Sequence, residues 1–387
     1  MHVLIAPDCF TGTLTAAQAA RAIADGWRRG APHDDLTLVP LADGGTGFID
    51  VLRAGLDGEE HLVTVTDPLG RPVPAPLLVT RDDGRTTVWI ESAQAIGLHL
   101  LAAGERNPDV TSSAGLGDLL LAALDLSPSR IVVGLGGSAT NDGGAGLLAR
   151  LGAGADARLT GGGAGLLNLP DDALPGLRQV RERFSGIDLV IASDVDNPLL
   201  GLQGASATFA AQKGASPQQA QDLERALGAW HDRVSKALPP PTDLMTGRAR
   251  RYDREPGAGA AGGVGYALMV IGGRLRSGVD LVIDVLGVAS AAAAADLVVT
   301  GEGSFDWQSL HGKVVAGVAQ ACLEVGTPCI VLAGRVELGR RQAQNLGLSG
   351  MYAVAETPEQ VEASLADPVA TLTTRAARIA GTWSPRP

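Results

Sequence analysis

Apolar positions in the first sixty residues alternate between strand-like and helical spacing. Residues 2–6 form a short apolar run, which predicts a buried strand. Residues 13–30 place apolar positions at helical spacing between a threonine N-cap and a final glycine, which predicts an amphipathic helix. Residues 35–40 predict a second strand and residues 44–55 a second helix. This order of elements is typical of a parallel α/β sheet.

The spacing of apolar positions changes from His61 onward. Residues 61–80 and 85–92 alternate apolar and polar positions with a period of two and carry Gly and Pro turns, so they predict an antiparallel ribbon. The rest of the middle predicts alternating helices and strands: helix 112–124, strand 130–134, helix 143–152, strand 186–194 and helix 217–238.

From about Ala289 the pattern of the N-terminal segment returns. The predicted elements are strand 295–301, helix 314–326, strand 328–334, strand 350–356 and a terminal helix. Because the two ends resemble each other and the middle differs, we predict an α/β protein of two domains. Residues 1–58 and 290–387 form one discontinuous domain, and residues 59–289 form an inserted domain that carries the Gly-rich loops.

Composition and charge exclude several classes of partner. The chain has 387 residues, a net charge of −11 and only 3% aromatic residues. No basic stripe supplies the phosphate contacts on which nucleic-acid affinity depends, and an anionic membrane surface is excluded for the same reason. We find neither a signal-peptide pattern nor an uncharged apolar run of about 18 residues. Three cysteines without metal spacing favour a reducing, cytoplasmic location.

The stretch "IVVGLGGSATNDGGAG", residues 131–146, runs from a strand pattern into a Gly-rich loop and then a helix pattern. Free backbone N–H groups and the helix dipole make this arrangement an anion site, and glycine lets a ligand approach the backbone. Ser138 and Thr140 add hydroxyls there. The alternative is a sharp turn with an N-cap, for which Asn141 or Asp142 suffices. Two separate Gly-Gly pairs favour the anion site.

Lysine is rare in this chain and twice stands beside glycine. Only three of the 31 basic residues are lysines, namely Lys213, Lys236 and Lys313. Lys236 falls in the polar helix, where a solvated face is expected. Lys213 in "QKGA" and Lys313 in "HGKV" indicate contact with an anion.

Carboxylates follow several of the predicted strands. They are Asp8, Asp43, Asp194, and the pair Glu302 and Asp306. Ligands of α/β sheets bind beyond the carboxyl ends of strands, where such acids serve as general bases or Mg²⁺ ligands. Each alone is also a common helix cap. Together, anion loop, lysines and acids indicate phosphoryl transfer, which needs an aligned hydroxyl, a base and cations for developing charge.

A dinucleotide-dependent dehydrogenase is the main rival from another enzyme class. The stretch 134–139, "GLGGSA", fits GxGxxA after a strand. No acidic residue closes a second strand about 20 residues later, which argues against the dinucleotide interpretation.

Eight segments as a set resemble the bacterial glycerate kinase family whose N-terminus reads APDSFKGSL. In chain order they are "APDCFTGTLTA", "PLADGGTGFIDVL", "VTDPLGRPV", "GLGGSATNDGGAG", "ASDVDNPLLG", "FAAQKGA", "GAGAAGGVG" and "DLVVTGEGSFDWQSLHGKVVAGVA". The resemblance implies ATP-dependent phosphorylation of D-glycerate, with Mg²⁺ and 2-phosphoglycerate as the expected product. It also implies two α/β domains with the active site in the cleft between them. One domain is Rossmann-like, with a parallel sheet built from both chain ends, and the inserted one is mixed α/β.

Roles follow for the matched positions as a hypothesis. Asp194 abstracts or orients the proton of the acceptor hydroxyl, and Lys213 and Lys313 neutralise phosphate oxygens. Asp306 or Glu302 holds Mg²⁺. The residues expected to bind substrate or phosphate are Asp8, Thr11, Asp43, Gly44, Gly136, Gly137, Ser138, Thr140, Asn141, Asp142, Asn197 and Gly301. Glycerate is the expected small-molecule partner, and a homodimer is an open option.

The chain departs from the family pattern at three positions near its start. The family's "SFKG" reads "CFTG" here, so Cys9 replaces the serine and Thr11 the lysine, and Thr46 replaces the acidic residue of "ADGGEG". A neutral threonine cannot supply the charge of lysine. The alternative to a glycerate kinase is therefore a catalytically weakened or substrate-shifted hydroxy-acid kinase.

Overall fold

The computed structural model describes residues 1–10, 12–242, 245, 247–310 and 313–384. The chain divides into two compact units. The terminal unit comprises Met1–Asp43, Asp50–Leu56 and the chain from Ser277 onward, and the central unit comprises Gly44–Ile49 and Asp57–Arg276. The division differs from the predicted boundaries in three places: residues 277–289 belong to the terminal unit, and residues 44–49 and 57–58 belong to the central unit.

Tertiary packing explains why residues 277–289 belong to the terminal unit. Helix α10 (Gly278–Val285) lies against α12 (Val314–Val325). At Gly317 of α12, an added Cβ would stand 2.4 Å from Val279 and 2.8 Å from Ile283. The two helices are close enough to share one core, which the spacing of apolar residues along either helix does not reveal.

A five-stranded parallel sheet forms the core of the terminal unit, so the predicted α/β class with a parallel sheet built from both chain ends is confirmed. Its order is β13-β11-β9-β1-β2. The strands are β1 (His2–Ile5), β2 (Asp35–Leu38), β9 (Leu297–Thr300), β11 (Cys329–Ala333) and β13 (Leu348–Ala353). A separate short parallel pair is formed by β10 (Ser304–Phe305) and β12 (Arg335–Val336), which follow β9 and β11 in the chain.

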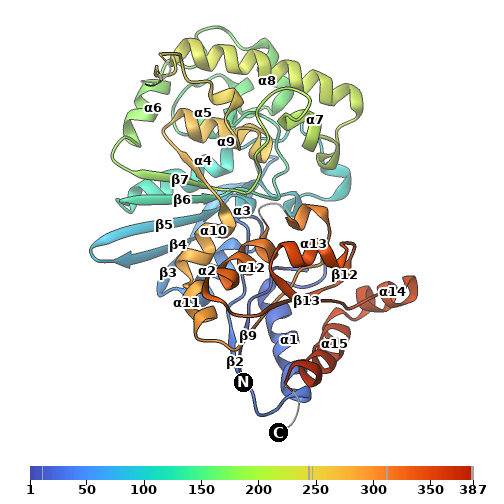
Figure 1. Cartoon of the computed structure of the whole chain (residues 1–387). Helices are drawn as coiled ribbons and strands as arrows, with labels where there is room; N and C mark the ends of the chain where they lie inside the picture. Colours follow the sequence, from blue (N-terminus) through green and yellow to red (C-terminus); the bar gives the residue numbers. More distant parts are fainter. Residues whose placement is uncertain (11, 243–244, 246, 311–312, 385–387) are drawn as a thin grey trace. The chain divides into compact units, whose positions relative to one another are not determined.

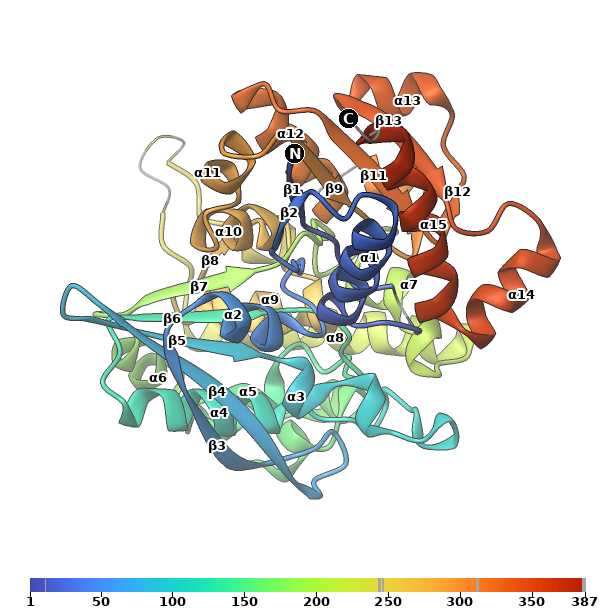
Figure 2. The ribbon, with the colours of Figure 1, turned by 90° about the horizontal axis from the view of Figure 1, so that it is seen from below.

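Helices from the two chain ends pack against each other in this unit. Figures 1 and 2 both show α1 (Ala16–Gly30) beside α15 (Pro368–Trp383). Added Cβ atoms at Gly26 and Gly30 would each stand 2.2 Å from a carbonyl oxygen of α15, so the two glycines allow the close approach. Thr15 caps α1 in a capping box with Gln18, as the N-cap pattern predicted. The remaining helices are α11 (Val288–Ala293), α13 (Arg340–Asn345) and α14 (Pro358–Ala366).

A six-stranded mixed sheet forms the core of the central unit, in the order β3-β4-β5-β6-β7-β8. The first three strands are antiparallel, which confirms the predicted ribbon, and β5 to β8 run parallel. The strands are β3 (Gly58–Thr66), β4 (Pro72–Asp82), β5 (Arg85–Glu91), β6 (Arg130–Gly134), β7 (Asp188–Ala192) and β8 (Arg274–Arg276). Strand β5 therefore belongs to both the ribbon and the parallel set.

Helices of the central unit gather over one face of this sheet in Figure 1. They are α4 (Ala114–Asp125), α5 (Ala145–Arg150), α6 (Leu177–Arg183), α7 (Ala205–Phe209), α8 (Pro217–Ala237) and α9 (Ala260–Val270). Short α3 (Ala93–Ile96) follows β5, and α2 (Phe48–Gly55) spans the boundary of the units in the sequence. The buried indole of Trp230 on α8 donates to the carbonyl of Gly143, 2.9 Å away. None of the helices in the described part of the chain is long and apolar enough to cross a bilayer.

Helix α9 begins with a left-handed turn that the sequence did not reveal. Ala261, Gly262 and Gly263 have φ values of 52°, 70° and 93°. The Gly262 carbonyl accepts a hydrogen bond from the amide of Gly143 at 2.9 Å. An added Cβ at Gly262 would stand 1.9 Å from the Thr140 carbonyl oxygen. The Gly-rich segment 257–263 thus serves close backbone packing against the loop after β6.

The matched substitutions Ala261→Gly and Gly262→Ala test this packing. Ala261→Gly should change the free energy of unfolding by less than about 1 kcal/mol, because relief of left-handed strain offsets the greater chain entropy of glycine. Gly262→Ala should lower it by about 3 kcal/mol or more, because its Cβ meets backbone that has no room to move. Denaturant titration of both variants measures the difference, and equal effects would contradict the close approach.

Candidate functional site

Three segments of the central unit meet at the carboxyl ends of its parallel strands. The register pairs Gly134, the last residue of β6, with Ala192, the last residue of β7. An added Cβ at Gly134 would stand 2.4 Å from the Gly44 carbonyl oxygen, and one at Gly44 would stand 2.6 Å from that of Ala192. The segment 44–49 therefore crosses the ends of both strands in backbone contact, which only glycine permits at these positions.

The loop after β6 exposes its backbone over a short stretch only. Gly137 is exposed with φ +62°, and Gly136 is partly exposed. From Ser138 onward the loop is buried, and Ser138 itself is 5% exposed. The backbone around Gly136 and Gly137 is therefore the part of this loop that a ligand can reach. The neighbouring Thr46, in the crossing segment, is also exposed.

Thr140, Asn141 and Asp142 lie wholly within the protein. One Asp142 oxygen accepts the backbone N–H and the hydroxyl of Ser113, both at 2.8 Å, and the other accepts the amide of Gly144 at 3.1 Å. Burial raises the pKa of Asp142, and the bonds from Ser113 oppose that rise. The N-cap of α5 is Gly144 and not Asn141 or Asp142, although Asp142 accepts the amides of Gly144 and Gly146 at the start of that helix. Oδ1 of Asn141 is buried without a hydrogen-bond partner among the described residues.

Lys213 is buried beside the same loop. Its side chain is 2% exposed, and its Nζ donates to the Thr140 carbonyl at 2.7 Å. Burial lowers the pKa of Lys213 to about 7, and the charge of Asp142 opposes that change. The Lys213 ammonium therefore holds the backbone of the loop from within the fold. Any phosphate that binds Lys213 has to reach a side chain that is almost fully buried.

Asp194 and Asn197 follow β7 at the edge where the Gly-rich loop begins. Asp194 stands two residues beyond the strand and is half-buried. Asn197 donates from Nδ2 to the Gln203 carbonyl at 2.7 Å. Because β6 and β7 are parallel and in register, the strand ends place Asp194 on the same side of the sheet as Gly136.

A separate group of carboxylates occupies the terminal unit. Glu302, Asp8 and Asp43 follow β9, β1 and β2, which are neighbours in the sheet. The Asp8 amide donates to the Gly301 carbonyl at 2.8 Å, which ties the ends of β1 and β9 together. Burial raises the pKa of Asp8 to about 7, and the charges of Asp43 and Glu302 add to the rise.

Glu302 is the most buried member of this group. It is 5% exposed, and burial raises its pKa to about 7. A hydrogen bond from Ser309 and the charge of Lys313 oppose the rise, whereas the charges of Asp306 and Asp43 reinforce it. Lys313 directly precedes α12 and is half-buried. The predicted residues Asp8, Asp43, Glu302, Asp306 and Lys313 therefore influence one another electrostatically within one unit.

The carboxylates of the terminal unit have one feature expected of a metal site. Oε1 of Glu302 is buried and has no hydrogen-bond partner within the described residues. Across the described ranges, no three or more Asp, Glu, His or Cys side chains converge as a complete metal cage. Mg²⁺ usually takes only one or two carboxylates and completes its shell with water and substrate phosphates. Glu302 and Asp306 fit that mode of binding.

One predicted residue and two residues that the sequence analysis overlooked remain. Thr11 lies outside the described residues. Glu91 and Ser92, at the end of β5, were not among the predicted site residues; the Glu91 carboxylate accepts the Ile49 amide at 3.1 Å, and the Ser92 amide donates to the Gly134 carbonyl at 3.0 Å. The signal was present in "WIES", where polar residues follow a strand. Interpreting that strand as part of an antiparallel ribbon hid its parallel pairing with β6.

Comparison with known proteins relates the chain to one enzyme family over nearly its full length. The model described as "Glycerate kinase family" matches residues 3–384. A glycerate kinase of Bacillus subtilis strain 168 is 38% identical over 359 residues, covering 92% of this chain and 90% of the relative. A glycerate 2-kinase of Escherichia coli K12 is 39% identical with the same coverage. A crystal structure of a candidate glycerate kinase 2 from Salmonella typhimurium LT2 has a TM-score of 0.75 and 36% identity, covering 99% of this chain and 98% of that one.

The substitution Glu302→Gln tests whether burial raises the pKa of the Glu302 carboxylate. An acid whose pKa is raised in the folded state holds a proton that the unfolded chain releases, so stability falls as pH rises from about 4.5 to about 7. The neutral glutamine escapes this loss. In buffer free of divalent metal, Glu302→Gln should be more stable than the parent by about 2 kcal/mol at pH 8, with a smaller gain at pH 5.

The exposed Glu337 of the same unit supplies the matched control. Glu337→Gln should leave the unfolding temperature unchanged at both pH values. Thermal unfolding of the three proteins at pH 5 and pH 8 measures the effect. A gain for Glu302→Gln that is the same at both pH values would contradict a raised pKa.

Proposed function

The chain belongs to the glycerate kinase family, and we propose that it transfers the γ-phosphoryl group of ATP to D-glycerate with Mg²⁺ as the metal and 2-phosphoglycerate as the product. The family match over residues 3–384 and the similarity to a glycerate kinase and a glycerate 2-kinase support the reaction class. A dehydrogenase that uses the loop 134–139 is disfavoured by the same match. A cytoplasmic location and a homodimer stay predictions from the sequence.

The observation that carries the proposal is the arrangement at the strand ends of the central unit. A backbone loop that is accessible at Gly136 and Gly137 stands at the same sheet edge as the half-buried carboxylate of Asp194. Backbone N–H groups suit an anionic substrate oxygen, and a carboxylate suits the proton of an acceptor hydroxyl. Phosphoryl transfer requires these two functions and cations for the phosphates.

In the proposed reaction, Asp194 accepts the proton of the glycerate hydroxyl as its oxygen attacks the γ-phosphorus. The bond between that phosphorus and the oxygen bridging to ADP breaks, and ADP leaves with the bond's electron pair. The accessible backbone at Gly136 and Gly137, with Gly44 and Asn197, holds substrate carboxylate or hydroxyl oxygens. These contacts orient the acceptor, which is the main task of a kinase active site.

The terminal unit supplies the charged groups of the proposal. Lys313 neutralises phosphate oxygens, and Glu302 with Asp306 holds Mg²⁺, which would offset phosphate charge when bound. Asp8, Asp43 and Gly301 stand at the neighbouring strand ends, and the charge of Asp43 adds to the burial that raises the pKa of Glu302. A divalent cation would favour the ionised form of these carboxylates, because opposite charge lowers a carboxyl pKa.

Four of the remaining predicted residues take an indirect role in this proposal. Lys213, Thr140, Asn141 and Asp142 are bonded to one another or to neighbouring protein groups, so we propose that they act by fixing the loop that meets the ligand. Direct contact of Lys213 with phosphate stays a prediction, as does contact by Thr11.

One assay tests the proposed function. ADP release is measured with a panel of small hydroxy acids in the presence of ATP and Mg²⁺, and NMR of the product identifies the phosphorylated hydroxyl. D-Glycerate should give the highest kcat/KM and a phosphorus coupling at carbon 2. A higher kcat/KM with another hydroxy acid would establish a shifted substrate, and no ADP release with any acid would refute the kinase.

The substitution Asp194→Asn tests the proposed base. It should lower kcat by about 10²–10⁴-fold, the usual contribution of a positioned acid or base, with little change in KM. The exposed Asp196, two residues further on, gives the matched control Asp196→Asn, which should retain the parent kcat. Steady-state ADP release measures both variants. Near-normal turnover by Asp194→Asn would remove Asp194 as the base.

A further inference from the structure

The turn between β3 and β4 is built around a buried carboxylate. Asp67 is 2% exposed and accepts the backbone amides of Leu69 and Arg71, each at 2.8 Å. The Arg71 carbonyl accepts the Asp67 amide at 2.7 Å, which closes the turn. These residues form "TDPLGR" within the motif "VTDPLGRPV", to which the proposed reaction assigns no role.

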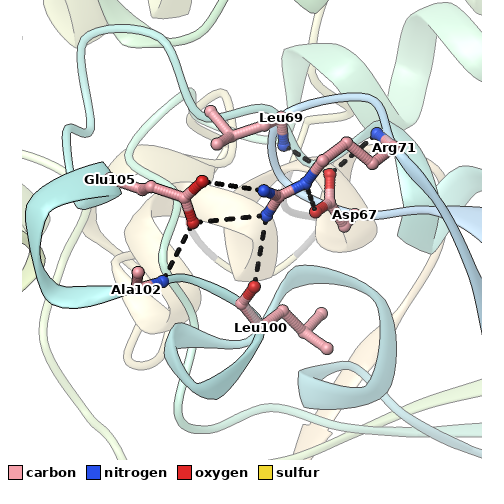
Figure 3. Close-up of polar contacts among 6 residues, drawn as sticks. All are labelled: Asp67, Leu69, Arg71, Leu100, Ala102 and Glu105. Carbon is pink, nitrogen blue, oxygen red and sulfur yellow. Dashed lines mark hydrogen bonds and ion pairs between the residues drawn. The ribbon is translucent and has the colours of Figure 1, made fainter.

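The Arg71 side chain leaves this turn and binds a second segment. Figure 3 shows the Arg71 guanidinium between the carboxylates of Asp67 and Glu105, with the Leu100 carbonyl beside it. Nε lies 2.6 Å from Asp67, one terminal nitrogen 2.8 Å from Glu105, and the other donates to the Leu100 carbonyl at 3.2 Å. Lysine cannot make these three contacts together, because only the guanidinium presents donors in a rigid fork.

Glu105 binds both Arg71 and the backbone of its own segment. One of its oxygens accepts the Ala102 amide at 2.9 Å and also faces Arg71. The Ala102 N–H, and after it Arg71, lower the pKa of Glu105. We call residues 97–105 the strap. Its two 3₁₀ turns, Leu98–Leu100 and Ala103–Glu105, contain no buried residue. Leu101, between them, is 4% exposed, so the strap is held by this one buried leucine and by polar contacts at its turns.

The strap pairs with the accessible part of the Gly-rich loop. The Leu98 amide donates to the Gly137 carbonyl at 2.8 Å, and Gly97 forms an antiparallel bridge with Ser138. Just before the strap, the Ile96 carbonyl accepts the Ala139 amide at 2.7 Å. The carbonyl that Arg71 binds is thus two residues from the amide that holds Gly137.

We propose that Arg71 is a positioning residue for the reaction: by fixing the strap, which pairs with Gly137 and Ser138, it keeps the accessible backbone at Gly136 and Gly137 in the orientation that meets the substrate. The kinetic part of this inference rests on the proposed function, whereas the structural part does not. Displacing a substrate-binding backbone by about 1 Å costs catalysis far more than stability, because reactive geometry tolerates little error.

Three variants and one control test the inference on the full chain. Arg71→Lys keeps the charge but loses the fork, Arg71→Ala removes both, and Glu105→Gln removes the ion pair on the strap side. The control is Arg81→Lys, because Arg81 lies in the same ribbon but pairs with the exposed Glu59 of the neighbouring strand at 2.9 Å. Arg71→Lys and Glu105→Gln keep the test valid if Arg71→Ala does not fold.

Two measurements are made on each protein. Hydrogen exchange follows the amides of Leu98 and Ala139, and steady-state kinetics gives kcat and KM for glycerate and ATP. In the Arg71 and Glu105 variants, the hydrogens of these two amides should exchange with solvent about tenfold faster, while the core amides of β6 stay protected. Their kcat/KM for D-glycerate should fall about tenfold or more, and Arg81→Lys should match the parent in both measurements.

Each result decides the inference. Unchanged exchange at Leu98 and Ala139 would overturn it, and so would faster exchange with parental kinetic constants. Loss of protection throughout the central unit would also overturn it, because Arg71 would then stabilise the fold in general. If the parent shows no phosphoryl transfer, the proposed function fails, and the exchange data alone decide whether Arg71 positions the loop.

Discussion

Backbone-to-backbone contact at the carboxyl ends of β6 and β7 is the constraint on which the central unit depends. Gly44, Gly134 and Gly136 each stand where an added Cβ would lie within 2.6 Å of another backbone atom. These contacts bring the crossing segment, the loop after β6 and the end of β7 to one place without side chains between them. Ordering these glycines costs conformational entropy on folding, and the close contacts leave a rigid, accessible backbone surface at the strand ends.

Burial of like charges shapes the terminal unit in a different way. Asp8 and Glu302 stand at neighbouring strand ends with pKa values raised to about 7, chiefly by burial. A desolvated carboxylate costs folding free energy, and here two of them lie near Asp43 as well. Carboxylates with raised pKa values are typical of functional sites, and a bound cation offsets the free-energy cost of their burial because it favours the ionised form. The terminal unit thus gives up stability in the region that we propose binds Mg²⁺ and phosphate.

Local sequence patterns predicted most helices and strands, and the features that they missed depend on tertiary contacts. The strand 2–6, the helix capped at Thr15 and the antiparallel ribbon follow from periodicity and capping, which depend on nearby residues only. The left-handed turn at Ala261 was not predicted, because alanine rarely adopts it and packing against Thr140 imposes it. The parallel pairing of β5 was missed because its partner β6 lies almost forty residues further along the chain.

The two glycine-flanked lysines show why residue type alone did not separate ligand-binding groups from structural ones. Both were predicted to contact phosphate. Gly214, after Lys213, has φ +96°, and an added Cβ would stand 2.2 Å from the Arg106 carbonyl oxygen, so this glycine serves packing. Lys213 is correspondingly buried on the Thr140 carbonyl, whereas Lys313 is half-buried at the start of α12, beside Glu302. A glycine next to a lysine indicates close approach, and only the fold shows whether the approaching group is protein or ligand.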